Sequence, residues 1–177
     1  MSFPALRALV LSAFLAALAG LLAAPAPASA SPSWLDQLRD ATRGYHSLGH
    51  AKADGYAKFL DAAGIACIDM PGEGGMGVHY VNGDLVGDGD VLADHPEALV
   101  YDPTPQGPRL VALEYIVFKD AWRKEHAHGR PHLFGQRFEA AGADNRYGIP
   151  PFYELHVWAW KHNRSGLFED WNPQVTC

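Results

Sequence analysis

Three polar side chains interrupt runs of residues that otherwise favour β-strands. They are Glu114 in RLVALEYIVF, His79 in GVHYV and His156 in FYELHVWAW. Two imidazoles and one carboxylate are good ligands for a first-row divalent ion, with water completing the coordination. If the three strands pair in one sheet with matching registers, the sequence predicts that these side chains meet at one point.

Glu114 lies in the strand whose surroundings most clearly predict burial. Both faces of residues 110–118 are apolar apart from Glu114 and Tyr115, which is typical of a strand covered on both sides. A buried carboxylate needs a cation, a proton or hydrogen-bond donors. Two interpretations fit this requirement. One is a metal ion held by the His/Glu set, and the other is a buried His–Glu hydrogen-bond network without a metal.

Further side chains are candidates for supporting roles in a metal site. Three histidines crowd residues 126–132, and of these we expect His126 and His132 to be additional ligands. Tyr115 or Glu154 would support the ligands from outside. If the site is catalytic, Glu154 is the candidate general base acting on metal-bound water. Zinc or copper suits a histidine-rich site.

Several other kinds of site are not indicated. The glycine-rich residues 69–77 lack the Gly-Lys-Ser/Thr ending of a phosphate loop and the βαβ setting of a dinucleotide site, so no nucleotide cofactor is expected. We interpret this stretch as a shaped loop. A G-x-S-x-G nucleophile motif does not occur. The net charge of −6, without a basic run, argues against nucleic acid and anionic membrane surfaces as partners.

Residues 1–30 have the features of an export signal. An apolar run covers residues 8–24, prolines follow it, and Ala28-Ser29-Ala30 matches a cleavage site. A retained membrane anchor is the alternative, but the run is short for a span of roughly 20 residues. We expect residues 31–177 to form a single globular domain that is secreted or periplasmic, with no stable membrane span in the mature chain.

The chain has two cysteines, Cys67 and Cys177. In an exported protein an even number of cysteines favours a disulfide. The alternative is a pair of thiolate metal ligands.

The remaining pattern predicts an α+β fold, a mainly antiparallel sheet with N-terminal helices packed against it. Ser33 is the expected N-cap of a helical pattern that runs from Trp34 to Ala63 with a break near Gly49. Asn82-Gly83 predicts a two-residue hairpin turn with a return strand over residues 84–86. Strands are also expected at residues 65–68 and 97–101, and a helix at residues 119–127.

A stretch of the chain resembles the oil body-associated proteins of plants and their microbial relatives. The resemblance is carried by ALVYD (residues 98–102) followed by RLVALEYIVF, and extends to His79-Tyr80 and YELHVWAW. It covers roughly residues 76–160. It implies a shared fold with polar residues in matching strands and exported bacterial relatives, and it supplies no reaction. Val78 stands where the family pattern has a second histidine beside His79.

Together these features predict an exported metal-binding protein with a His/Glu site on its central strands. The alternative is a non-enzymatic exported binding or structural module with a buried His–Glu network. The partner would be a small molecule or another exported protein, and the residues do not name it.

Overall fold

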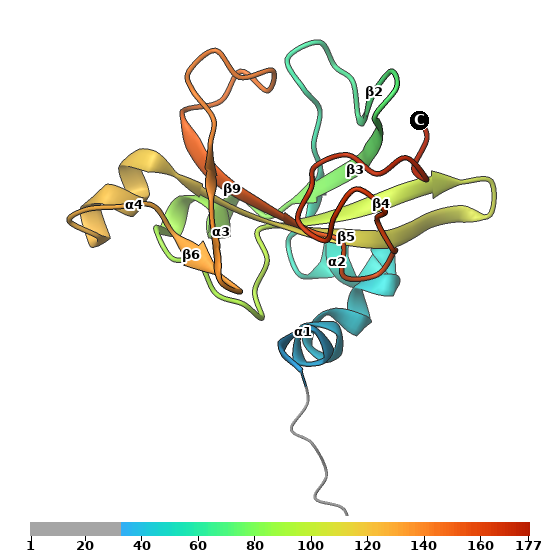
Figure 1. Ribbon diagram of the computed structural model, residues 1–177, viewed down its shortest axis with the longest axis horizontal. Coiled ribbons are helices and arrows are strands. Elements are labelled where there is room, and N and C mark those ends of the chain that lie inside the picture. Colours follow the sequence, from blue (N-terminus) through green and yellow to red (C-terminus); the bar gives the residue numbers. More distant parts are fainter. Residues whose placement is uncertain (1–32) are drawn as a thin grey trace, which may run out of the picture. The chain divides into compact units, whose positions relative to one another are not determined.

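The computed structural model describes residues 33–177, so the expected signal peptide lies outside the described residues. This part of the chain forms a seven-stranded sheet in which every pairing is antiparallel, as predicted (Figure 1). The strand order is β1-β3-β4-β5-β9-β8, and β2 also pairs with β3. The bounds are β1 (Ala57–Lys58), β2 (Cys67–Met70), β3 (Gly74–Val81), β4 (Ala98–Thr104), β5 (Gly107–Phe118), β8 (Glu139–Ala140) and β9 (Phe152–Val157). A separate two-stranded sheet holds β6 (His132–Leu133) and β7 (Gln136–Arg137).

The helices are short and lie mainly before the sheet in the sequence. They are α1 (Trp34–Thr42), the 3-10 helix η1 (Arg43–His46), α2 (Leu48–Ala53), α3 (Gly83–Asp88) and α4 (Lys119–Glu125). Ser33 caps α1 as predicted, because its side chain accepts a hydrogen bond from the Asp36 amide. No helix in the range 33–177 is both long and apolar enough to cross a membrane.

The first helical pattern ends earlier than the sequence indicated. The break falls at η1, and Ser47 starts a new helix by accepting a hydrogen bond from the His50 amide. The chain leaves α2 at Ala53, and β1 then takes residues that the helical pattern had included. Periodicity over residues 56–63 was misleading because pairing of β1 with β3 outweighs local helix preference there.

Asn82-Gly83 does not form the expected hairpin turn. The Asn82 side chain accepts a hydrogen bond from the Asp84 amide and caps α3, so residues 84–86 are helical rather than a return strand. The same side chain donates to the carbonyl oxygen of Asp54 at 3.0 Å. Asn is favoured both in tight turns and at N-caps, and this contact with the end of α2 stabilises the N-cap conformation.

The glycine-rich segment is a β-hairpin rather than a loop, since it supplies the end of β2 and the start of β3. Gly74 has a φ of 116°, and a Cβ there would collide with the backbone of Asn172. Next to it, Gly75 exchanges two backbone hydrogen bonds of 3.1 Å with Asn172. Glycine is therefore required where the C-terminal segment lies against β3.

Cys67 and Cys177 form a disulfide with an S–S distance of 2.10 Å, which confirms that pairing over a pair of thiolate ligands. The bond joins β2 to the last residue of the chain (Figure 1). The C-terminal segment also covers one face of the central strands. The buried apolar residues of this contact are Val100, Val111, Ala112, Trp158 and Val175.

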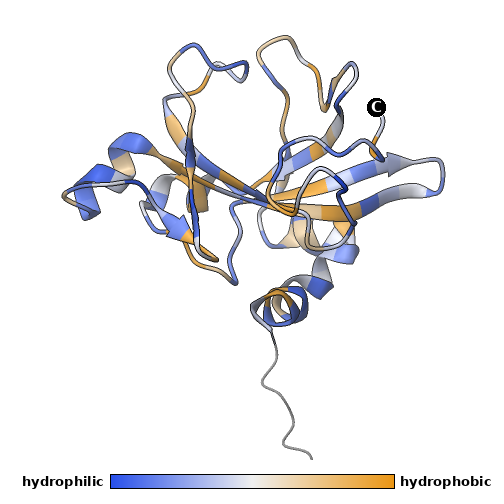
Figure 2. Ribbon diagram, in the orientation of Figure 1, coloured by the Kyte–Doolittle hydropathy of each residue, from blue (hydrophilic) through white to orange (hydrophobic). Residues whose placement is uncertain are grey.

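A β-bulge changes which face each residue of β5 occupies. Val100 pairs with Ala112 and Tyr101 pairs with Leu110, so Val111 is the extra residue. Strict alternation predicts Leu110 on the face of Glu114, but beyond the bulge Leu110 packs in the main core on the other face. Apolar residues line the central strands, whereas α4 is mostly hydrophilic (Figure 2).

Candidate metal centre

Strands β3, β5 and β9 bring the predicted His/Glu set together, with β4 lying between β3 and β5. On β5, Glu114 is directly opposite His156 of β9 on one side and Ala98 of β4 on the other. His79 of β3 is opposite Val100, two positions along β4 from Ala98. Because Ala98 has only a methyl group, the His79 ring reaches across β4 to Glu114.

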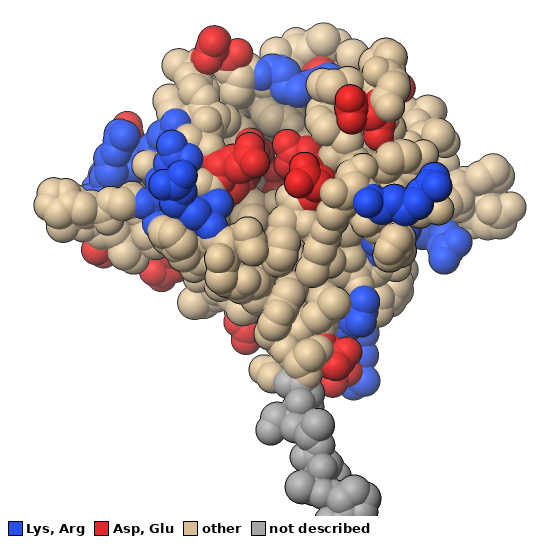
Figure 3. Space-filling view, viewed as in Figure 1, with Lys and Arg blue, Asp and Glu red and all other residues tan. Residues whose placement is uncertain are grey.

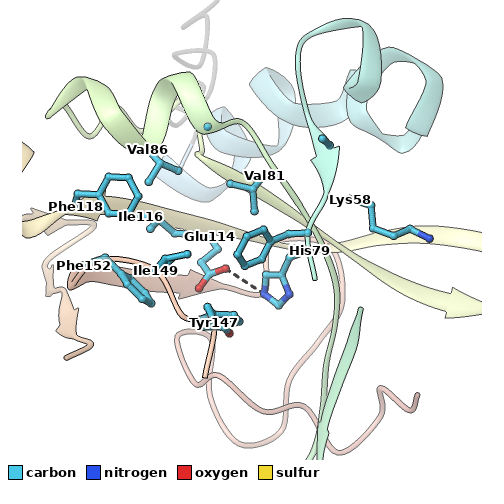
Figure 4. Close-up of a pocket in the computed structure, with 13 residues that line it drawn as sticks. Lys58, His79, Val81, Val86, Glu114, Ile116, Phe118, Tyr147, Ile149 and Phe152 are labelled. Atoms are coloured by element: carbon cyan, nitrogen blue, oxygen red, sulfur yellow. Dashed lines mark ion pairs between the residues drawn. The ribbon is translucent and has the colours of Figure 1, made fainter. Parts of the chain in front are cut away.

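The distances define a compact cluster. His79 Nε2 lies 3.1 Å from Glu114 Oε2 (Figure 4). One ligand atom from each of His79, Glu114 and His156 lies within 4.8 Å of the other two. The three residues are 3%, 3% and 1% exposed. The predicted meeting of these side chains is therefore present in the structure.

Both imidazoles lack hydrogen-bond partners. Neither ring nitrogen of His79 and neither ring nitrogen of His156 makes a hydrogen bond within residues 33–177. His79 Nε2 has Glu114 Oε2 at ion-pair distance, 3.1 Å away, as its polar neighbour. A buried polar group without a partner costs about 1–3 kcal/mol, so these nitrogens need an explanation.

The electrostatic surroundings favour the metal-binding forms of two of the residues. Burial lowers the pKa of His156 to about 4, although Glu114 acts in the opposite direction, so the ring is neutral at neutral pH. Burial favours protonation of Glu114, but the charge of His79, then His156, and a hydrogen bond from Glu154 outweigh it and lower the pKa of Glu114. A neutral imidazole and an ionised carboxylate are the forms that coordinate metals.

Further carboxylates surround the cluster. Burial, followed by the charge of Glu114, raises the pKa of Glu154 to about 9 and that of Asp170 to about 6. Acidic side chains gather in a hollow on the face shown in Figure 3. At neutral pH Glu154 is thus a protonated donor to Glu114. These surroundings do not support the general-base role expected for Glu154.

A cavity of about 250 Å³ lies beside the cluster. Lys58, His79 and Glu114 are the ionisable residues of its lining, Tyr147 carries a hydroxyl, and the other lining residues are apolar. Figure 4 shows Val86, Ile116, Phe118, Ile149 and Phe152 grouped around the Glu114 side. Small-molecule sites have this composition, with mainly apolar walls and a few polar groups that fix the orientation of the ligand.

The structure does not bring the other predicted residues to the cluster. His126 ends α4 and stacks on Trp122 with ring centroids 3.5 Å apart. His132 is exposed in the separate β6–β7 sheet. Tyr115 faces the opposite side of β5, where its hydroxyl donates to the carbonyl oxygen of Ala93 at 2.7 Å. None of these three belongs to the ligand group within residues 33–177.

Sequence reasoning missed Tyr147, which lines the cavity. Its hydroxyl lies 4.0 Å from the sulfur of Met76. Asn145 holds the loop by accepting a hydrogen bond from the Tyr147 amide and donating one to the carbonyl oxygen of Ile149. The sequence signal was weak, since an irregular segment rich in Gly, Pro and Asn gives no direction for one aromatic side chain.

Comparison with known proteins adds no functional information, because no protein-family model, curated protein or solved structure matches the chain. The resemblance to oil body-associated proteins therefore stays a prediction.

Proposed function

We propose that this protein is an exported metal-binding protein that holds a divalent ion with His79, Glu114 and His156. Zinc and copper are the preferred ions because both accept imidazole and carboxylate ligands. The observation that carries the proposal is the pair of buried imidazoles without hydrogen-bond partners beside a buried carboxylate. An ion would use nitrogen lone pairs that the protein leaves unused.

The distances are compatible with this role after a small adjustment. Tetrahedral zinc with bonds of about 2.0–2.1 Å places its ligand atoms roughly 3.3 Å apart. The 3.1 Å separation between His79 and Glu114 matches that spacing, and the largest separation in the group is at most 4.8 Å. His79 and Glu114 line the cavity, so a further ligand would arrive from that side.

The alternative without a metal makes a different demand on the same residues. A structural His–Glu network stabilises a core only if its members are hydrogen-bonded. The imidazoles of His79 and His156 make no such bonds among the described residues. This observation favours the metal-binding function over the purely structural network.

Metal analysis of the exported form tests the proposal. Residues 31–177, untagged and with the disulfide formed, are incubated with zinc or copper, freed of loose ions and analysed by mass spectrometry for metal content. We expect about one ion per chain for the wild type and almost none for a His79→Ala/His156→Ala variant. A His126→Ala/His132→Ala variant removes two histidines outside the cluster and should keep the ion.

Folding of each variant is checked by near-ultraviolet circular dichroism. Absence of bound ion from the wild type, or equal ion content in a folded His79→Ala/His156→Ala variant, would reject the proposed function.

A further inference from the structure

We propose that the apolar part of the cavity binds a small, uncharged aromatic molecule, namely a single ring with a short alkyl chain. The His79–Glu114 end of the cavity remains for the ion and the water bound to it. The inference goes beyond the proposed function, because it concerns a second ligand that lies among the apolar walls and makes no bond to the ion.

The charge of the proposed ion does not select this ligand. A divalent ion adds two positive charges at the His79–Glu114 end, next to the carboxylate that holds it. A hydrocarbon has no net charge on which this field can act, and it has no donor atom with which to replace a ligand of the ion. Its binding therefore depends on the size and composition of the walls, and it does so in every charge state of the cluster.

The volume of the cavity leaves room for one ring beside the ion. The cavity measures about 250 Å³. A metal-bound water has a liquid volume of about 30 Å³, and a cavity of roughly 150 Å³ already holds benzene. A benzene ring with an ethyl group therefore fits beside a hydrated ion, whereas a long acyl chain or a sterol is too large.

The lining beyond the cluster offers few partners to water. Lys58 is exposed and points away from Glu114 (Figure 4), and the Tyr147 hydroxyl lies 4.0 Å from the sulfur of Met76. The other lining residues outside the cluster are apolar. A buried water needs several polar partners, and a charged group among these walls would lose its hydration without gaining a partner. A hydrocarbon covers the apolar walls without either cost.

The walls favour an aromatic ring over a saturated one. Phe59, Phe118, Tyr147 and Phe152 all line the cavity. The ring centroid of Tyr147 lies 5.7 Å from that of Phe59 and 6.0 Å from that of Phe152, within the range of favourable aromatic contacts. A bound aromatic ring would extend this cluster through edge-to-face or offset contacts, which a saturated ring of the same size cannot make.

The two loops that supply Phe59 and Tyr147 are tied together. Arg146 donates a hydrogen bond to Asp61 at 2.8 Å, and the Asp61 side chain is 4% exposed. The Ala62 amide donates to the carbonyl oxygen of Arg146 at 3.2 Å. These bonds hold this aromatic wall in place before a ligand arrives, as is usual in small-molecule sites.

Small residues mark a route into the cavity. Ala57 and Lys58 of β1 and Gly83 at the start of α3 are exposed members of the lining. A Cβ at Gly83 would meet no atom within 4 Å. The ring would therefore enter between β1 and α3, on the side where the lining reaches the surface.

Headspace gas chromatography, which measures the free hydrocarbon above a protein solution, tests the assignment with ethylbenzene. We expect saturable binding of about one molecule per chain. The affinities of metal-free and zinc-incubated protein should agree within about threefold, because the ring and the ion do not share a ligand atom. Ethylcyclohexane is the comparator of similar size without an aromatic ring. After each affinity is divided by the partition coefficient of the compound between hexane and water, ethylbenzene should bind about threefold or more tightly than ethylcyclohexane.

Two variants fill the cavity without changing a ligand residue. Ile149→Trp should weaken ethylbenzene binding about tenfold or more. Val86→Phe fills the cavity from α3 and takes its place if Ile149→Trp does not fold, as judged by near-ultraviolet circular dichroism. The matched Leu92→Trp variant changes a residue that is 53% exposed and outside the cavity, and should bind like the wild type.

The absence of saturable ethylbenzene binding by the wild type, or equal binding by a folded cavity-filling variant, overturns the assignment. Normalised binding of ethylcyclohexane equal to that of ethylbenzene also overturns it, and so does loss of binding on zinc loading. Metal content measured on the same samples tests the proposed function separately. Ion-free protein that binds ethylbenzene rejects the metal proposal and supports the ring site, whereas ion-loaded protein that does not bind it does the reverse.

Discussion

The buried polar side chains on the two faces of the central sheet differ in their hydrogen bonding. On one face the hydroxyls of Tyr56, Tyr101 and Tyr115 each donate to a backbone carbonyl at 2.6 or 2.7 Å. On the other face the imidazoles of His79 and His156 make no hydrogen bond within the described residues. The first arrangement stabilises the folded state, since a partner within the chain replaces water. The second arrangement leaves ring nitrogens that a ligand from outside the chain can bind.

The two buried glutamates show the same contrast. Glu97 is 2% exposed, and one of its oxygens accepts the Ile116 amide at 2.9 Å, yet burial raises its pKa to about 8. Glu114 is equally buried, but the neighbouring histidines lower its pKa. The Glu97 side chain thus accepts a hydrogen bond from the backbone of β5, whereas Glu114 remains an anion. Burial alone therefore does not distinguish a functional carboxylate from a structural one. The charged groups next to the carboxylate make that distinction.

The largest expected effect concerns the C-terminal segment, which covers the face of the sheet that carries Glu114. The Cys67–Cys177 disulfide spans 110 positions and fixes the C-terminal segment there. A Cys67→Ser/Cys177→Ser variant should lose about 4.7 kcal/mol of unfolding free energy by the chain-entropy estimate for a loop of this size. Urea denaturation measures the loss, and hydrogen exchange should show it first at the Gly75 and Asn172 amides. A loss below about 1 kcal/mol would show that the segment stays in place without the bond.

A smaller effect is expected at Glu97 and depends on pH. Its pKa is about 8 in the folded protein against an ordinary 4.5, so the folded state holds a proton that the unfolded state releases. Stability therefore falls as pH rises from 4.5 to 8. Glu97→Gln should remove this loss and gain about 1–4 kcal/mol at pH 8.5, with little change at pH 4. Urea titrations at both pH values measure it, with exposed Glu73→Gln as the control. An equal effect at both pH values would contradict the ionisation argument.

The next prediction tests whether the tyrosine hydroxyls stabilise the fold. Tyr115→Phe removes the bond to Ala93 and leaves that carbonyl without its donor. We expect a loss of about 1 kcal/mol at neutral pH and unchanged metal content. Thermal and urea unfolding provide the measurement. A gain in stability would show that this face is not organised by its hydrogen bonds.

The smallest expected effect concerns the metal-free form of a His156→Leu variant. The lost ring has no hydrogen bond to give up within the described residues, and Leu has a similar volume. Stability should change by less than about 1 kcal/mol or rise slightly. Added zinc should raise the melting temperature of the wild type and not that of the variant. A large loss of stability in metal-free His156→Leu would indicate that the imidazole belongs to the core.

The sequence predicted the central strands because they follow from local features. It predicted the meeting of His79, Glu114 and His156 only on the condition that the strand registers match, and the observed pairings meet that condition. Apolar alternation marks a strand, and a polar residue inside it is visible without knowledge of its partners. The sequence did not predict the bulge at Val111, because its position depends on how β4 aligns with β5. Register is a property of pairs of strands and is not encoded in one strand alone.

Other errors also come from contacts between distant segments. Asn82 fits a turn or an N-cap equally well, and its bond to Asp54 accompanies the N-cap. His126 was grouped with the cluster by residue type, but it caps the C-terminus of α4 and stacks on Trp122. Residue type indicates which chemistry is available, and packing decides which residues take part.

The strand order has a consequence for folding kinetics. β4 and β5 are joined by a tight connection, but β9 pairs with β5 only after a long connection closes. The His/Glu cluster needs β3, β5 and β9 together, so we expect it to be assembled after the rate-limiting step, when the β4–β5 hairpin already exists. Interactions that form after the folding barrier slow unfolding without changing the refolding rate. An ion at this cluster would therefore extend the lifetime of the native state rather than guide the chain toward it.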